Sequence, residues 1–309
     1  MQASQLSVGR AGPGLAFAIG AYGLWGLLPI FFALLLPTDA FEIVAWRIVL
    51  SLVFCALLLT VTRGWSVFAR IVRDRRIVLI MGLAGLFILV NWLVYVFAAL
   101  SGHIVEASLG YFTNPIVTVL LGVFVLRERL RPLQWISIGI SAVAVLVLAI
   151  NYGSFPWIAL TLAVSFGVYG LIKKQVGGRV DAISGLTIET AWLAPLAIAQ
   201  LIGMTVTSGL TIGTVSPAHT VLLLSAGVVT AVPLLLFAAA ARRLPLTVLG
   251  LTQYIAPILQ FLIGVFFFKE DMPAARWLGF SLVWVALVVL TVDIFLSGRP
   301  SRRASLERV

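Results

Sequence analysis

Long apolar runs, separated by short polar segments, fill most of the chain. A helix needs about 20 apolar residues to cross the hydrocarbon core of a bilayer. Barrel strands would be shorter and would alternate polar with apolar positions, which these runs do not do. The pattern therefore predicts an all-α polytopic membrane protein with ten transmembrane helices. We expect these helices over residues 14–36, 41–61, 77–99, 104–126, 133–150, 155–173, 182–203, 219–241, 246–268 and 274–296.

One stretch of this pattern occurs twice in the chain. Residues 98–147 align without a gap with residues 240–289, so that Pro115 falls on Pro257. Identical residues also pair at Ile116 and Ile258, Leu120 and Leu262, Gly122 and Gly264, Val123 and Val265, Phe124 and Phe266, Glu128 and Glu270, and Trp135 and Trp277. A duplicated hydrophobic unit of this kind predicts two pseudo-symmetric halves, residues 14–150 and residues 155–296, with five helices each.

The odd number of helices per half has a consequence for topology. The second half must enter the membrane from the side opposite to the first, so the two five-helix repeats are inverted. Their first helices also correspond, because Tyr22–Gly26 and Phe166–Gly170 share an aromatic–Gly–apolar–aromatic–Gly pattern. Inverted repeats predict a membrane carrier whose site lies near the midplane between the halves and opens to either side in turn.

Composition and charge agree with a bilayer setting. Apolar residues make up 61% of the chain and charged residues only 10%, against about 25% charge in soluble domains. A net charge of +10 can indicate nucleic acid, but all the basic residues except Arg47, Lys269 and Arg276 fall on one side of the predicted bundle. This is the positive-inside pattern. It predicts a protein of the bacterial inner (plasma) membrane with both termini in the cytoplasm and no nucleic-acid partner.

Two polar segments lie outside the predicted spans. Residues 63–73 place Trp65, Phe68 and Ile71 at helical spacing between arginines, which predicts a short amphipathic helix on the inner membrane surface. Residues 297–309 are polar and basic, which predicts a disordered cytoplasmic tail.

Several local sequences carry a family resemblance. Residues Val105–Pro115 resemble a signature of the RarD-like carriers, a branch of the drug/metabolite transporter superfamily with EamA-type repeats. Asn91-Trp92, Glu189–Trp192 and Gln253–Pro257 are similar to the same branch, and the resemblance extends over residues 14–293. It implies an inner-membrane permease with ten helices in two inverted five-helix halves. The branch is associated with chloramphenicol sensitivity, and the resemblance leaves the physiological substrate open.

Three ionisable residues stand out within the predicted spans: Arg47, Glu106 and Glu189. Such groups cost about 2.5–3.5 kcal/mol each on insertion scales, so each is a candidate for transport or coupling. Arg47 and Glu189 occupy equivalent repeat positions with opposite charge, each roughly 10 Å deep from opposite surfaces. Two interpretations remain open: a structural or gating pair across the halves, or separate charges that line one polar cavity.

Glu106 begins a polar stripe on its helix. The stripe comprises Glu106, Gly110, Thr113, Asn114 and Val117, which share one helical face. A carboxylate that faces a half-wet cavity would serve as a proton-coupling site. The alternative is a structural role, because an acid in the first turn is favoured by the helix dipole, with His103 as its partner at the interface.

Other polar and aromatic side chains within the spans predict a solute cavity. The candidates are Tyr22, Trp25, Asn91, Tyr95, Thr113, Asn114, Gln253, Tyr254 and Gln260. Pro115 and Pro257 are expected to kink their helices or to free a carbonyl oxygen for this cavity. Helix packing or a membrane belt explains each aromatic residue taken alone. As a set, they suit a neutral or amphipathic organic solute better than an ion.

Some chemistries have no motif in the sequence. A phosphate-binding Gly-x-x-x-x-Gly-Lys-Ser/Thr loop, a His/Glu metal motif and a nucleophile elbow are all missing, so we expect no ATP, metal or other cofactor and no enzymatic activity.

The remaining hypothesis is secondary transport of a small organic metabolite or drug. Its candidate partners are the solute, the lipid bilayer, a proton or other coupling ion, and a second copy of the chain for a homodimer. The rival is a lipid-handling or enzymatic bundle, and a scramblase would need the Glu106 stripe to face lipid.

Overall fold

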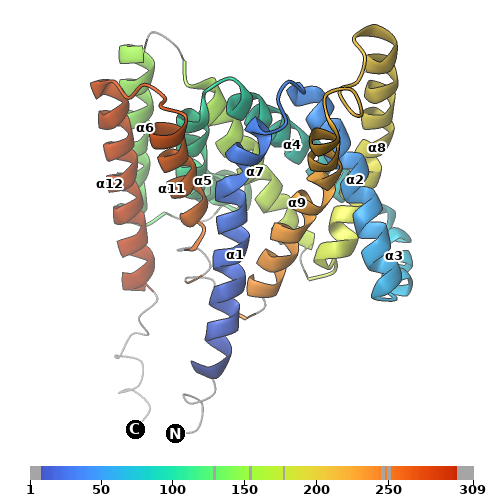
Figure 1. Ribbon diagram of the computed structural model, residues 1–309. Helices are drawn as coiled ribbons and strands as arrows, with labels where there is room; N and C mark the ends of the chain where they lie inside the picture. The colour runs from blue at the N-terminus through green and yellow to red at the C-terminus, as the bar shows by residue number, and fades with distance from the viewer. Residues whose placement is uncertain are drawn as a thin grey trace, which may run out of the picture.

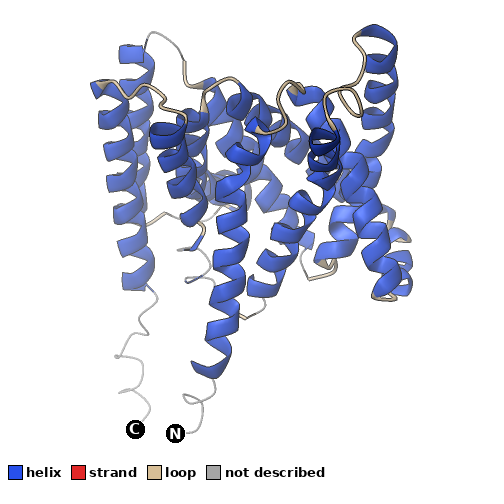
Figure 2. Ribbon diagram, in the orientation of Figure 1, coloured by secondary structure: helices blue, strands red, loops and turns tan. Residues whose placement is uncertain are grey.

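The computed structural model describes residues 8–127, 130–152, 155–176, 178–241, 243–244, 248 and 252–297. Within these ranges the secondary structure is helical and contains no strand (Figure 2). The first helices are α1 (Val8–Ala33), α2 (Ala40–Val61), α3 (Trp65–Val72), α4 (Arg75–Leu100), α5 (Ile104–Leu126) and α6 (Pro132–Tyr152). They are followed by α7 (Trp157–Val176), α8 (Ala182–Thr207), α9 (Pro217–Ala241), α11 (Ile255–Leu262), the π-helix η1 (Ile263–Phe267) and α12 (Ala274–Ser297).

Aspartates fix the beginning of several helices. Asp39 precedes α2 and accepts hydrogen bonds from the backbone N–H groups of Phe41 and Glu42. Asp74 caps α4 in the same way, and Asp181 accepts from the N–H of Ser184 in α8. The first N–H groups of a helix have no partner within the helix, so a side-chain acceptor at this position favours helix initiation there.

The predicted all-helical architecture is confirmed for the described residues, and each of the ten predicted spans overlaps a helix. Seven helices in this part of the chain are long and apolar enough to cross a membrane. Three shorter apolar helices cover Pro132–Val147, Trp157–Lys173 and Ile255–Phe267. The span predicted at 246–268 is described as a helix only from Ile255 onward, and residues 298–309, most of the predicted tail, lie outside the described residues.

The short amphipathic helix predicted within 63–73 is confirmed as α3. Ile71 is buried, and Phe68 packs against a cluster that includes Ile77 and Met81 of α4. The arginines of this segment are exposed. The apolar face of α3 therefore rests on the bundle while its basic face points outward.

The helices pack in a regular set of neighbours (Figure 1). α6 runs along α12, and α2 contacts both α8 and α9. α7 contacts both α4 and α5, and α1 contacts both α9 and α11. Close approach depends on glycine: a Cβ on Gly227 of α9 would lie 2.5 Å from the carbonyl carbon of Leu50 in α2, and a Cβ on Gly110 of α5 would lie 2.7 Å from the carbonyl oxygen of Ala159 in α7.

Candidate functional site

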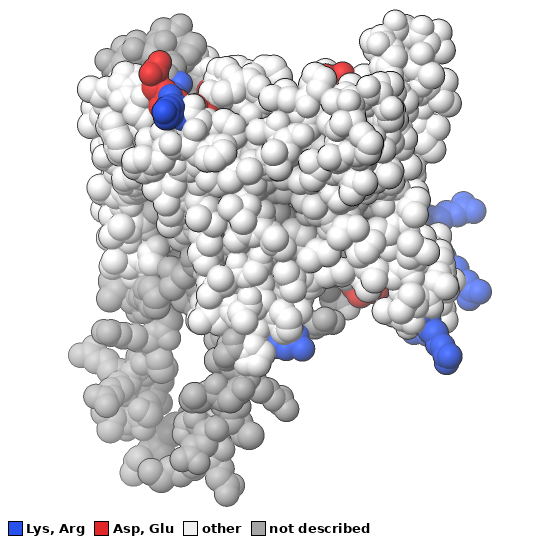
Figure 3. All heavy atoms as spheres, viewed as in Figure 1, with Lys and Arg blue, Asp and Glu red and all other residues white. Residues whose placement is uncertain are grey.

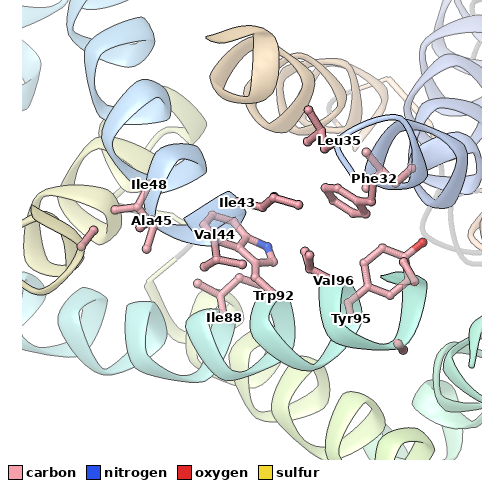
Figure 4. Packing of buried hydrophobic residues seen from close by; sticks show 14 of the residues in the cluster. Phe32, Leu35, Ile43, Val44, Ala45, Ile48, Ile88, Trp92, Tyr95 and Val96 are labelled. Carbon is pink, nitrogen blue, oxygen red and sulfur yellow. The ribbon is translucent and has the colours of Figure 1, made fainter. Parts of the chain in front are cut away.

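Arg47 of α2 is buried in the middle of the largest apolar cluster, with 4% of its surface exposed. Its guanidinium carbon lies 5.1 Å from the ring centroid of Phe32 and 4.7 Å from that of Trp92. Figure 4 shows Phe32 entering this region from α1 and Trp92 from α4. Its Nε donates a 3.0 Å hydrogen bond to the hydroxyl oxygen of Thr230 in α9. Cation–π contacts and one neutral hydrogen bond thus hold the charge.

The charge of Arg47 is only partly satisfied. Its Nη1 atom is buried and has no hydrogen-bond partner among the described residues. No carboxylate in the described ranges lies within 4.0 Å of the guanidinium nitrogens either. A buried charge without a partner is costly, so an uncompensated donor of this kind indicates a functional position.

Two side chains from α4 and α11 add further unsatisfied atoms. The hydroxyl of Tyr95 and the Oε1 of Gln260 are buried, and neither makes a hydrogen bond of ordinary geometry within the described chain. The two side chains are neighbours, and Tyr95 interacts electrostatically with Arg47. The amide nitrogen of Gln260 donates to the carbonyl oxygen of Trp25 at 3.3 Å. The ring of Tyr95 packs edge-on against Phe32 at 6.0 Å, which places it beside the guanidinium region.

Asn91 and Tyr111 complete this group. The Tyr111 hydroxyl donates to Asn91 Oδ1 at 3.0 Å, and Asn91 Nδ2 donates to the carbonyl oxygen of Leu162 and to the hydroxyl of Ser165 in α7. The rings of Tyr111 and Tyr95 are 5.5 Å apart, edge to face. The side chains of Asn91 and Tyr111 are therefore held in place by hydrogen bonds. Arg47, Tyr95 and Gln260 beside them each keep a polar atom that makes no hydrogen bond of ordinary geometry. We define the central polar cluster as Arg47, Asn91, Tyr95, Tyr111 and Gln260.

Glu189 has partners of its own. Its Oε1 accepts a 2.8 Å hydrogen bond from Lys173 Nζ, and its Oε2 accepts one from the Tyr169 hydroxyl at 3.3 Å. The direct pair between Arg47 and Glu189, one of the two sequence-based interpretations, is absent from the described structure. The reason is local, because Tyr169 and Lys173 lie one turn apart on α7 and supply Glu189 with a hydroxyl and a counter-ion from the adjacent helix.

Glu106 lies at the beginning of α5 and is half-buried. Its Oε1 accepts a 3.1 Å hydrogen bond from the N–H of Ile158 at the beginning of α7. The predicted stripe faces α7, because Gly110 packs on Ala159. His103, expected as the partner of Glu106, interacts with it electrostatically and also makes a hydrogen bond with Ser101. This geometry is that of an acid at a helix N-terminus.

Two more acids and a histidine hold backbone at the same end of the bundle. Glu270 accepts from the N–H groups of Ile104 and Val105, at 2.6 and 2.9 Å, and so caps α5. Glu42 accepts from the N–H of Thr211 in the segment between α8 and α9. The Nε2 of His219 lies 2.8 Å from the Thr38 hydroxyl, which in turn contacts the Thr211 hydroxyl at 2.6 Å. These contacts join segments that are far apart in sequence.

The other predicted cavity residues lie around the central polar cluster or away from it. Tyr22 and Trp25 form an aromatic group with Phe237 of α9. Thr113 bonds to its own helix at Gly110, and the Asn114 oxygen accepts from Thr118. Tyr254 lies beside Gln253 and Thr291 and packs with α12, away from Arg47.

The two prolines occupy unlike positions. Pro115 is inside α5, so the carbonyl oxygen of Tyr111 has no donor at the position one turn later. Pro257 is in the first turn of α11, where a proline removes no helical hydrogen bond. The expected freed carbonyl thus applies to α5 and not to α11.

Sequence reasoning missed five members of these groups: Tyr111, Tyr169, Lys173, Thr230 and Phe32. Lys173 ends the predicted span 155–173, and its spacing of four from Tyr169 was a usable signal of a shared helix face. Thr230 and Phe32 carry no such signal, because only the packing of α9 and α1 on α2 brings them to Arg47. Within the described residues, His, Cys, Asp and Glu do not gather in groups of three that suit a metal ion.

Comparisons with known proteins agree with this architecture. The EamA-like transporter family matches residues 12–150. Protein RarD of Streptomyces exfoliatus is 47% identical over 289 residues, which cover 94% of this chain and 91% of that protein. A Vibrio cholerae protein named as an uncharacterized transporter is 40% identical, over 94% of this chain and 96% of its own length. A crystal structure with 22% sequence identity shares the fold with a TM-score of 0.59 and covers 92% of this chain and 98% of that one.

Relatives at this level of identity, matched over nearly the full length of both chains, establish kinship. The matching family and the Vibrio cholerae relative are named as transporters, and the apolar helices described above fit a multi-pass protein of the bacterial inner membrane. The chain therefore belongs to the RarD proteins of the EamA-like transporter family, within the drug/metabolite transporter superfamily.

Proposed function

We propose that this membrane transporter is a secondary carrier that moves a small organic metabolite or drug-like solute by alternating access. In this proposal, residues 14–150 and 155–296 form two inverted halves of five transmembrane helices each. The solute binds at the central polar cluster, between the halves, and the halves rock to expose it to one side and then the other.

The central polar cluster is the observation that carries the proposal. Arg47, Tyr95 and Gln260 each present a buried polar atom that makes no hydrogen bond of ordinary geometry in the described chain, and the Tyr95 and Gln260 side chains are neighbours. Arg47 and Tyr95 belong to the first proposed half, whereas Gln260 and the Thr230 that holds Arg47 belong to the second. Polar atoms that are left free at a seam between two moving bodies are what a carrier needs to recognise a solute.

Several features support the inverted halves. The helix pairs match by repeat position: α1 contacts α9 where α7 contacts α4, and α2 contacts α9 where α8 contacts α4. The pairs α2 with α8 and α6 with α12 join equivalent helices across the proposed axis. Arg127 and Lys269, which are repeat-equivalent, both have left-handed backbone, with φ of 56° and 55°, just after their helices. Two halves related by a two-fold axis would produce these correspondences.

Charge supports the proposed orientation, with both termini in the cytoplasm. Figure 3 shows lysine and arginine side chains near the end where α1 begins and beside α3. At the opposite end, Figure 3 shows charges of both signs. Glu270 lies at this end, where it caps the beginning of α5. A concentration of basic residues on one side is the cytoplasmic signature of a membrane protein.

The proposed coupling ion is a proton, and Glu189 is its better-placed carrier. Glu106 accepts a hydrogen bond from a backbone N–H group of α7, and a backbone group cannot leave by changing rotamer. The partners of Glu189 are the side chains of Lys173 and Tyr169, which can change rotamer during a transport cycle. A carboxylate that exchanges partners is suited to take up and release a proton.

The rival lipid-handling function has less support. A scramblase would use a polar groove that faces lipid, but Glu106 and Gly110 of the polar stripe lie against α7. A direct test reconstitutes the purified protein in liposomes and measures both solute flux and lipid scrambling, with and without an imposed pH gradient. The proposal expects saturable solute flux that responds to the gradient, with scrambling no faster than in empty liposomes. Scrambling without saturable flux of any solute would overturn it.

A further inference from the structure

The free atoms of the central polar cluster have a definite chemistry. Arg47 Nη1 can only donate, the Tyr95 hydroxyl can donate, and Gln260 Oε1 can only accept. The rings of Phe32 and Trp92 hold the guanidinium by cation–π contacts, which use none of its N–H groups. A bound group that satisfies this set would present acceptor oxygens to Arg47 and Tyr95.

The cluster also has a charge to compensate. In the second half, the corresponding charge of Glu189 is matched by Lys173. The position that corresponds to Lys173 in the first half, at the offset of the first-helix alignment, is Pro29, so that half provides no counterpart to the counter-ion. Among the described residues Arg47 therefore has aromatic rings and the Thr230 hydroxyl beside it, but no acid.

We propose that Arg47 and Tyr95 form a subsite for the carboxylate of an amphipathic organic acid, which this carrier recognises as its solute. The inference rests on the proposed function and names its substrate class. Arg47 Nη1 and the Tyr95 hydroxyl donate to the carboxylate oxygens, and the apolar body of the acid lies among the neighbouring aromatic rings. Guanidinium and carboxylate groups are matched in geometry, and their hydrogen bonds are stronger than neutral ones.

Other anions and zwitterions fit less well. A phosphate dianion would bring two charges against the single charge of Arg47. The ammonium group of an amino acid would need a free carboxylate, and the buried Glu189 already binds Lys173. Gln260 Oε1 is a neutral acceptor, which suits a hydroxyl or amide N–H on the solute. A 2-hydroxy acid with an apolar side chain has a carboxylate for Arg47 and Tyr95, a hydroxyl for Gln260 and an apolar body for the aromatic rings.

The test uses matched probes on the purified full-length protein in detergent. The probes are 3-phenyllactate, indole-3-lactate and 2-hydroxyisocaproate, each with its primary amide, and phenylalanine as the zwitterion that matches 3-phenyllactate. Dissociation constants are measured from the ligand-induced rise in melting temperature. The inference expects at least one acid to bind about tenfold or more tightly than its own amide, as a charged hydrogen bond would give.

Three variants locate the effect. Tyr95→Phe removes a hydroxyl that lies beside the Gln260 side chain but makes no hydrogen bond of ordinary geometry, so the fold should remain intact while the affinity for the acid falls by about fivefold or more. Arg47→Gln should abolish the preference for acid over amide, and Arg47→Lys should restore it only in part. Arg70→Gln, at an exposed site on α3, is the matched control and should leave binding unchanged.

The outcomes test the carboxylate subsite and the proposed carrier function separately. Acids that bind no better than their amides, or a preference that persists in both Tyr95→Phe and Arg47→Gln, would overturn the carboxylate subsite. Saturable flux of neutral solutes in liposomes would in that case leave the carrier proposal standing. Conversely, binding of acids that depends on Arg47, without flux of any solute, would retain the subsite and reject transport.

Discussion

The Nζ of Lys173 lies 2.8 Å from the carboxylate of Glu189, and the position that corresponds to Lys173 in the first half of the sequence is Pro29. The two repeat-equivalent charges, Arg47 and Glu189, therefore differ in state. Glu189 is neutralised inside its own half, whereas Arg47 has no acid beside it among the described residues. In our proposals the duplicated unit has diverged into one half that compensates its charge and one half that reserves its charge for a solute.

The pair of Lys173 and Glu189 should respond unequally to loss of either member. The side chain of Lys173 is 30% exposed and that of Glu189 is 2% exposed. Lys173→Met leaves a buried carboxylate without its counter-ion and should destabilise the protein by about 3–5 kcal/mol. Glu189→Gln leaves a lysine that water can reach and should cost about 1–2 kcal/mol. Thermal unfolding in detergent measures both, and the double variant should recover most of the loss from Lys173→Met; equal costs would contradict this asymmetry.

Glu106→Gln should leave pH-gradient-driven solute flux in liposomes nearly unchanged. The glutamine carbonyl oxygen keeps an acceptor for the N–H of Ile158, which is the contact that Glu106 makes at the beginning of α7. Glu189→Gln, in contrast, should reduce the response to the gradient. Loss of gradient-driven flux in Glu106→Gln alone would restore the proton-coupling role that the sequence suggested for this residue.

The contribution of Glu270 to stability should fall as pH rises. Burial raises the pKa of this carboxyl above its ordinary value of 4.5, although hydrogen bonds from the N–H groups of Val105 and Ile104 act in the opposite direction. A raised pKa means that the folded protein binds the proton more tightly than the unfolded chain. The stabilisation is therefore complete below pH 4.5 and is lost as pH rises through the raised pKa.

Glu270→Gln removes this titration and provides the comparison. Melting temperatures of the two proteins, measured across a pH series, should show the native protein gaining stability relative to the variant on acidification from neutral pH. A difference that stays constant with pH, or that grows as pH rises, would show that the hydrogen bonds to α5 outweigh burial.

Gly227→Ala should destabilise the contact between α2 and α9. The new Cβ would lie 2.5 Å from the carbonyl carbon of Leu50, which is backbone and cannot rotate away. We expect a loss of about 1–3 kcal/mol, seen as a lower melting temperature. Gly203→Ala in α8 is the control, because nothing lies within 4 Å of its Cβ position, and it should be neutral or stabilising by about 0.5–1 kcal/mol. Similar effects of the two changes would refute the close approach.

The helices were predictable because bilayer-spanning segments can be identified by their length and their uniformly high hydropathy. The amphipathic α3 was predictable for a related reason, since Trp65, Phe68 and Ile71 repeat at helical spacing. The π-helix η1 was not predicted, because its residues, Ile263–Phe267, are as apolar as those of an ordinary helix. The sequence contains no periodic signal that separates the two geometries.

The candidate site was predictable as a list of residues but not as a set of partners. Asn91, Tyr95 and Gln260 were identified as buried polar residues within spans, and Arg47 by its charge. Their grouping depends on how α2 packs against α4 and α9 and how α1 packs against α4, α9 and α11. The reach of the Lys173 side chain decides the partner of Glu189. Repeat symmetry suggested a pair between Arg47 and Glu189 because the two residues occupy equivalent positions. Equivalent positions in two repeats need not lie close together in the structure.

The acids at the end of the bundle opposite the termini have one further consequence. Glu270 holds α5, Glu106 holds α7 and Glu42 holds Thr211, and each of these bonds crosses from one proposed half to the other. The repeat counterparts of Glu106 and Glu42 are Val248 and Ser184, which carry no carboxylate, whereas the counterpart of Glu270 is Glu128. In the proposed orientation, these three carboxylates therefore join the two halves at the periplasmic mouth. In our proposal, these contacts must separate before the carrier opens to that side, so part of the free energy of solute binding goes into breaking hydrogen bonds that are far from the solute.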